Sequence, residues 1–282
     1  MVALQIACFA IVATFVFFRS RLEARPSALL LRLLVLAVSA WIGEDTCIRA
    51  YGFYEYSAGW WLFLDKVPLL IVLIWPIVVQ SARDLAVCLW AGRERPRPLK
   101  VGATVFCLVL ADASLIEPIS VKAGLWRWTE PGLFEVPPIG ILGWAYFAAV
   151  AIAVLEEAAW RYRPWLSALA LTVAPVTTHV ALLVSWWGLF RWVNVTIPSW
   201  VPVLLAWIAS MAVVSRSLRS VTRRRVPPAL LWIRVPAALF FFVLLGLHGR
   251  EDASLVLYAL AFAPPYLSVL SLGAARPAPG NV

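Results

Sequence analysis

Residues 101–118 read VGATVFCLVLADASLIEP, an apolar run of 18 residues that carries two carboxyl groups. An α-helix rises about 1.5 Å per residue, so this run crosses most of the roughly 30 Å of hydrocarbon in a bilayer. The run therefore predicts a transmembrane helix. Carboxyl groups are costly inside a membrane, so those of Asp112 and Glu117 are candidates for function.

The rest of the chain repeats this apolar character. Of its 282 residues, 63% are apolar and 14% are charged, against roughly 45–50% and about 25% in soluble domains. Eight more apolar runs of similar length surround 101–118: 2–18, 28–43, 67–82, 138–155, 165–187, 199–215, 229–247 and 254–272. The sequence predicts an all-α polytopic membrane helix bundle of about nine transmembrane helices, with seven or eight as alternatives. Residues 1–275 form one membrane domain, and 276–282 a short cytoplasmic tail.

The basic residues are distributed unevenly between the two sets of connections. Eighteen of the 24 Lys and Arg residues lie in alternate connections, beginning with the one after the first run, or in the tail. The other six are Arg49, Lys66, Lys122, Arg127, Arg191 and Arg250. Because cytoplasmic loops are enriched in Lys and Arg, the N-terminus is predicted outside and the C-terminus in the cytoplasm of a bacterial inner membrane. This sidedness accounts for the net charge of +9 without a nucleic-acid partner.

Several function classes are excluded by what the sequence lacks. Two histidines, His179 and His248, cannot build the His-rich iron site of membrane desaturases. No DDxxD-type aspartate pair is present for a magnesium-dependent prenyl transferase. The four cysteines have no CxxC spacing and read as packing residues. We therefore expect neither a metal site nor a cofactor.

The acidic residues gather in one part of the chain. Asp112 lies roughly 16 Å into its run, and Glu117 follows just before Pro118, which is predicted to end or kink the helix. Because the two residues are five positions apart on one helix, their carboxyls are expected to point about 140° apart around its axis. Glu44 stands at the outer end of the second run. The alternatives are a helix-to-helix hydrogen bond for Asp112 and a plain interfacial charge for Glu44.

Aromatic residues surround these acids in sequence. Tyr54 and Tyr56, like Trp126 and Trp128, alternate as on one side of an extended segment. A carboxylic acid beside π faces suits protonation of an alkene, because the rings stabilise a carbocation and a dry pocket discourages side reactions. For the tryptophans alone, an interfacial belt is the alternative.

Taken together, these motifs resemble those of the membrane-integral carotenoid biosynthesis family, which includes the CruF-type carotenoid 1,2-hydratases. The resemblance covers residues 40–145 and rests on Glu44, the run YGFYEY at 51–56, Val67-Pro68-Leu69, Trp75, Asp112, Glu117-Pro118, Gly124, Trp126, Trp128, Val136-Pro137 and Gly143-Trp144. Two positions depart from the family pattern: Glu135 replaces an expected Gly, and Gly140 an expected Asn.

The resemblance implies water addition across the terminal C1=C2 bond of an acyclic carotenoid. Asp112 or Glu117 protonates C2, and Glu44 is the other acid or the base that orients water. The implied substrate-binding residues are Tyr54, Tyr56, Trp75, Trp126, Trp128 and Trp144. The implied partners are a carotenoid or other polyisoprenoid, the lipid bilayer and other carotenoid-pathway enzymes, with no redox cofactor.

Two alternatives to hydration stay open. A lycopene-cyclase-like enzyme begins with the same protonation, and Glu156-Glu157 faintly resembles the paired glutamates of small membrane cyclases. An interfacial charge cluster with Arg161 and Arg163 is the other interpretation of those glutamates. From another class, a transporter or lipid-binding membrane protein would use Asp112 to relay protons or bind a cation, although no internal repeat is visible.

Overall fold

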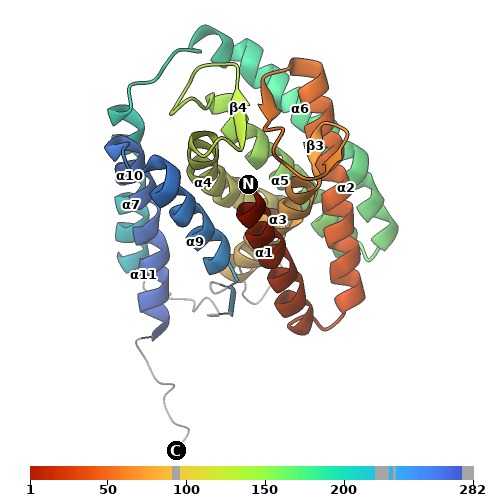
Figure 1. The fold of residues 1–282 in the computed structure, drawn as a ribbon. Helices are drawn as coiled ribbons and strands as arrows, with labels where there is room; N and C mark the ends of the chain where they lie inside the picture. The colour runs from red at the N-terminus through yellow and green to blue at the C-terminus, as the bar shows by residue number, and fades with distance from the viewer. Residues whose placement is uncertain (91–95, 220–228, 231–232, 275–282) are drawn as a thin grey trace, which may run out of the picture.

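The computed structural model describes residues 1–90, 96–219, 229–230 and 233–274. Its long helices surround a common core, with two short β-ladders at one end (Figure 1). The helices are α1 (Val2–Arg21), α2 (Pro26–Tyr51), α3 (Leu69–Trp90), α4 (Pro98–Lys122), α5 (Pro138–Trp160), α6 (Ala170–Gly188), α7 (Trp200–Arg219), α9 (Val235–Leu244), α10 (Ala253–Leu260) and α11 (Ala263–Ala274), with short turns η1 (Pro164–Leu169), η2 (Phe190–Trp192) and η3 (Leu245–Gly249). The strands are β1 (Tyr54–Tyr56), β2 (Phe63–Leu64), β3 (Val67–Pro68) and β4 (Trp126–Trp128).

The predicted all-α membrane bundle is confirmed. Within the described residues, seven helices are long and apolar enough to cross a membrane, the lower end of the predicted range. The predicted runs 229–247 and 254–272 contain shorter helices instead. Proline has no N–H for a helix, and Pro264 and Pro265 follow the point where α10 gives way to α11. The predicted tail, 276–282, lies outside the described residues.

Of the two outcomes predicted for Pro118, a helix end or a kink, the helix end does not occur, because α4 continues to Lys122. A proline inside a helix leaves the carbonyl four residues earlier without its usual donor. Here that carbonyl belongs to Ser114, and the Tyr258 hydroxyl of α10 donates a hydrogen bond to it at 2.9 Å. The replacement bond satisfies the backbone and ties α10 to α4 beside Glu117.

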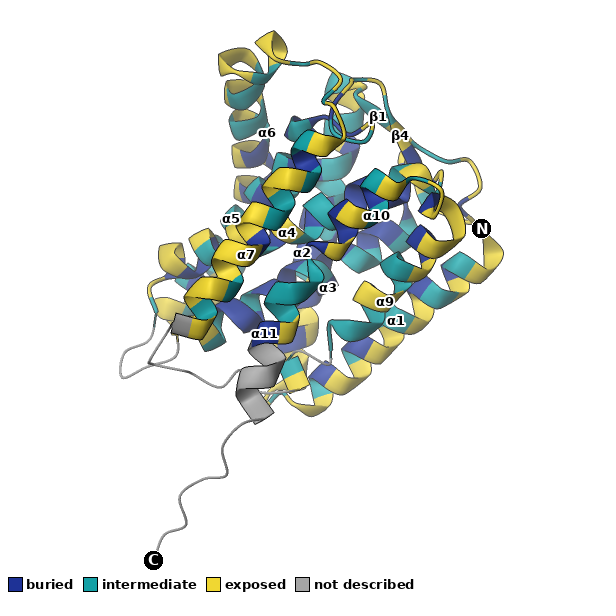
Figure 2. Cartoon of the chain, turned by 90° about the vertical axis from the view of Figure 1, so that its left-hand side faces the viewer, coloured by how far each residue is buried: buried dark blue, intermediate teal, exposed yellow. Residues whose placement is uncertain are grey.

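The apolar residues divide between an inner core and an outer lipid-facing surface. Val105 and Val109 of α4 pack with Ala148 and Ile152 of α5, and all four are fully buried. The outer faces of α1, α6 and α7 are exposed (Figure 2). Those faces carry large apolar side chains such as Phe9, Val184 and Leu205, as expected of helices that contact lipid.

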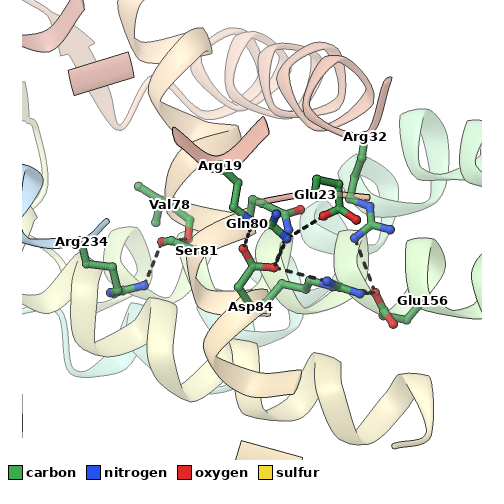
Figure 3. A network of polar contacts seen from close by, with 10 residues as sticks. Arg19, Glu23, Arg32, Val78, Gln80, Ser81, Asp84, Glu156 and Arg234 are labelled. Carbon is green, nitrogen blue, oxygen red and sulfur yellow. Dashed lines mark hydrogen bonds and ion pairs between the residues drawn. The ribbon is translucent and has the colours of Figure 1, made fainter. Parts of the chain in front are cut away.

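A charged network joins the helices at the end opposite the ladders (Figure 3). Arg19 of α1 donates to Asp84 of α3 at 2.6 Å, and Gln80 donates to the same carboxylate at 2.8 Å. Arg83 and Arg32 both reach Glu156 of α5, at 2.8 and 3.9 Å. Glu157 pairs separately with Arg161. Both glutamates thus form ion pairs at this end of the bundle, Glu156 with Arg32 of α2 and Arg83 of α3 and Glu157 with Arg161.

This network predicts a large stability effect at Asp84. Replacing Asp84 by Ala leaves the buried Arg19 guanidinium without its main partner, which we expect to cost about 3–5 kcal/mol of unfolding free energy. Removing Glu55 breaks an exposed pair with Arg127, whose side chains are 59% and 76% exposed, and we expect a cost below about 1 kcal/mol. Denaturation of both variants in the same detergent measures the difference; equal losses would contradict the assignment.

Candidate active site

Two glycines let the chain leave α2 and α4 in matching ways. Gly52 follows α2 with φ +61°, and Gly124 follows α4 with φ +69°. Glycine adopts these left-handed angles without a Cβ penalty, so both segments turn directly into short strands. The strands β1 and β4 then pair antiparallel, with Tyr54 opposite Trp128 and Tyr56 opposite Trp126.

This ladder places four aromatic rings on one face. The Tyr54 ring lies 4.6 Å from Trp128, and the Tyr56 ring 5.8 Å from Trp126, between centroids. The middle pair, Glu55 and Arg127, forms its ion pair on the opposite face. Side chains alternate across a strand, so the predicted alternation of these four aromatic residues is confirmed.

Three donors hold the Glu44 carboxyl group. Tyr54 donates its hydroxyl to Oε1 at 2.8 Å, and Tyr56 donates to the same oxygen. Trp75 of α3 donates its Nε1–H to Oε2 at 2.7 Å. Burial, with the nearby Glu44 charge, raises the pKa of Tyr54 and Tyr56 well above the usual value of a phenol. Both phenols therefore keep their protons and serve as donors.

Three indole groups hold the Glu117 carboxyl group, which is only 2% exposed. Trp126 and Trp128 of β4 donate to Oε2 at 2.8 and 3.0 Å. Trp144 of α5 donates to Oε1 at 2.7 Å. Indole can only donate, so Glu117 is an acceptor in all three bonds.

Each carboxyl group keeps one oxygen with spare capacity. An sp² oxygen accepts about two hydrogen bonds, so Glu44 Oε1 and Glu117 Oε2 are saturated. Within the described part of the chain, the other two oxygens each accept from a single indole, Trp75 and Trp144 respectively. Those two rings pack on each other, with centroids 4.4 Å apart. The free acceptor positions of both carboxyls therefore lie beside one pair of tryptophans.

Both carboxyl groups line one cavity of about 330 Å³. Its wall includes all six aromatic residues predicted to bind substrate: Tyr54, Tyr56, Trp75, Trp126, Trp128 and Trp144. The cavity is also lined by four residues that no motif in the sequence indicated: Phe147 of α5 and Thr178, Leu182 and Trp186 of α6. An apolar cavity with a few converging polar groups has the character of a binding site for an apolar molecule.

Asp112 lies elsewhere and does not line this cavity. It pairs with Arg234 at 2.5 Å and accepts a hydrogen bond from Tyr266 at 3.2 Å. Asp112 and Glu117 point to different sides of α4, as their helical spacing predicts. The structure thus brings Glu44 and Glu117 together and leaves Asp112 with the C-terminal helices.

The departure at Gly140 has a steric reason. A Cβ atom at this position would lie 2.5 Å from the Trp128 ring. An Asn side chain could enter here only if Trp128 moved, together with its hydrogen bond to Glu117. In this chain the indole fills the space that a side chain at position 140 would need.

The departure at Glu135 has a conformational consequence. Leu133 and Val136 exchange both backbone hydrogen bonds around a two-residue turn, in which Phe134 has φ +46° and Glu135 φ +66°. Such a turn favours Gly at its second position, as in the family pattern. Phe134 adopts the same strained region but packs its ring 5.2 Å from that of Tyr258.

We expect Glu135→Gly to stabilise the protein by about 1 kcal/mol, because glycine relieves the left-handed strain and the Glu135 side chain is exposed. Thermal denaturation in detergent measures the effect. The control is Phe134→Gly, which relieves similar strain but removes a packed ring, and which should destabilise. A loss of stability in Glu135→Gly would contradict the strain assignment.

Comparison with known proteins identifies the family. A family model described as carotenoid biosynthesis protein matches residues 1–213, a range that contains every residue lining the cavity. No curated protein and no solved structure matches the chain.

Proposed function

The chain belongs to the carotenoid biosynthesis protein family, and from this premise we propose that it hydrates the terminal C1=C2 bond of an acyclic carotenoid end group. The observation that carries the proposal is the pair of carboxyl groups on one aromatic-lined cavity, each held by three donors and each with one free acceptor position. An apolar end group can enter such a cavity, and the carboxyls can transfer protons there.

In the proposed reaction, protonated Glu117 donates its proton to C2. The C1=C2 π electrons form the new C–H bond, and a tertiary cation remains at C1. Trp126, Trp128 and Trp144 surround the acid, so their π faces can stabilise that charge. Water attacks C1, its released proton passes to Glu44, and exchange with solvent restores the starting protonation of both acids.

The surroundings of the two carboxyls support this division of roles. Glu117 is surrounded by indole rings, which cannot accept a proton and present aromatic faces. Glu44 is held by two phenols, whose oxygens have lone pairs left to bind water. The proposal therefore makes Glu117 the acid and Glu44 the base, and it gives Asp112 no part in proton transfer to substrate.

The orientation predicted from the basic residues completes the proposal. With that orientation, the end of the bundle that carries the charged network faces the cytoplasm, and the cavity lies at the other end, where α2 and α4 give way to the ladder. We place the reaction in the outer half of a bacterial inner membrane, with the polyene chain in the bilayer.

Expression in lycopene-producing cells tests the function. We expect a pigment heavier than the starting carotenoid by one water, absent from cells that express the Glu44→Gln, Glu117→Gln double variant at equal level. If the cells formed a cyclic hydrocarbon instead, hydration would be contradicted and the cyclase mechanism supported. No change in any pigment would favour the transporter or lipid-binding alternative.

A further inference from the structure

A second cavity, of about 260 Å³, lies on the other side of α3 and α4. Its wall comes from Ile11 of α1, Ile77 and Ser81 of α3, Asp112 and Leu115 of α4, and α9 and α11. The α9 and α11 residues that line it lie beyond residue 213, where the family match ends. The second cavity is therefore built in large part from a segment that the family description does not cover.

Four polar side chains meet on this otherwise apolar wall. Arg234 donates to Ser81 at 2.9 Å, a contact visible in Figure 3, and to Tyr266 at 3.0 Å. Arg234 also pairs with both oxygens of Asp112, and Tyr266 donates to Asp112 Oδ1. Among the described residues, Asp112 Oδ2 accepts from Arg234 alone. The cluster thus combines a neutral ion pair with one carboxylate oxygen that can accept a further donor.

The second cavity reaches the surface of the bundle between α4, α9 and α11. Ala111 of α4, Ala238 of α9 and Leu267 of α11 line it and are also exposed. On a membrane helix bundle, such an opening leads to the lipid. Its volume is below the range of about 300–1,000 Å³ typical of sites that enclose a whole ligand, so it suits one end of a longer chain.

The polar cluster restricts the ligand chemistry. An anionic headgroup would have to displace Asp112 from Arg234, at the cost of an unpaired buried carboxylate. A hydrocarbon would leave the remaining acceptor position of Asp112 Oδ2 unused. A hydroxyl group can donate to that oxygen while its chain contacts the apolar wall. An uncharged alcohol on a long apolar chain therefore matches both parts of the cavity.

We propose that this second cavity binds the hydroxyl-bearing end of an isoprenoid chain, with Asp112 as hydrogen-bond acceptor. The isoprenoid class rests on the family, and the hydroxyl rests on the Asp112–Arg234–Tyr266 cluster. The product of the proposed hydration has this chemistry, so the second cavity is suited to hold a hydroxylated end after it leaves the first. The proposal concerns binding and includes no chemical step.

Photocrosslinking of the purified full chain in detergent tests the proposal. The probe is geranylgeraniol with a diazirine on its chain, and the competitors are unlabelled geranylgeraniol, the matching C20 hydrocarbon and geranylgeranyl phosphate. We expect crosslinks in α9 or α11 that only the alcohol displaces efficiently. Ala237→Phe, which fills the second cavity, should reduce them about tenfold, whereas Leu205→Phe on the exposed face of α7 should not.

Tyr266→Phe tests Asp112 as the acceptor, because it frees a second acceptor position on Asp112 Oδ1 and keeps the Asp112–Arg234 pair. We expect alcohol binding to be kept or strengthened, with hydrocarbon binding unchanged. Equal displacement by alcohol and hydrocarbon, or crosslinks that Ala237→Phe leaves intact, would overturn the proposal. This experiment measures binding and no carotenoid conversion. Its outcome therefore does not depend on whether the chain hydrates a carotenoid in cells.

Discussion

Glu117→Gln is expected to lower carotenoid hydration by roughly 10²–10⁴-fold, the contribution of a positioned general acid. Glutamine has no proton to give at this position. Its amide nitrogen also cannot accept the indole hydrogen bonds that meet both oxygens of Glu117. One tryptophan therefore loses its acceptor, and the aromatic wall loses part of its order as well as its acid.

The matched control is Glu157→Gln, the same change on α5 at the opposite end of the bundle. Glu157 forms a partly exposed pair with Arg161, so its replacement should leave conversion within about twofold of wild type. Product formed per unit of purified protein, quantified by mass spectrometry, compares the two. A Glu117→Gln enzyme that keeps more than about a tenth of wild-type activity would remove Glu117 from the acid role.

The fold and most of the site follow from short-range features of the sequence. Apolar runs predict helices, and Glu44 and Glu117 lie near the ends of two of them, each followed by a glycine and an alternating aromatic strand. Those repeated features place both carboxyls beside one ladder. Four of the six predicted aromatic residues line the cavity because they lie on this ladder, and Trp75 of α3 and Trp144 of α5 complete the wall.

The position of Asp112 could not be predicted in this way. The position of a carboxyl deep in a membrane helix shows that its burial costs free energy. That position does not indicate which neighbouring helix or residue the carboxyl faces. Its partner Arg234 lies 122 residues later, in a part of the chain without a motif to link them. Trp186 was missed for a related reason: α6 contributes one side of the cavity from outside the block at 40–145, and a tryptophan near a helix end also fits an interfacial belt.

Glu44→Gln is expected to stop water addition and still permit protonation of the substrate. Without a base at Glu44, water reaching C1 has no acceptor for its proton, so hydration should fall by about 10²-fold or more. Glu117 and its three indole donors remain in place, so the cation still forms and returns its proton to Glu117. In D₂O the recovered carotenoid should therefore gain deuterium at C2, although little product appears.

Both variants are expected to lose product, so loss of product alone does not separate the roles of the two carboxyls. Deuterium uptake does separate them. Glu117→Gln should show neither hydration nor deuterium in recovered carotenoid, since protonation itself is lost. Tyr56→Phe is an intermediate case: it removes one donor from Glu44 Oε1 and leaves Tyr54 in place, so hydration should fall by about tenfold with deuterium uptake retained. If Glu44→Gln hydrates at the wild-type rate, or loses product without taking up deuterium at C2, then Glu44 is not the base. Loss of product without deuterium uptake would mean that the two carboxyls act as one coupled acid, because protonation would require both.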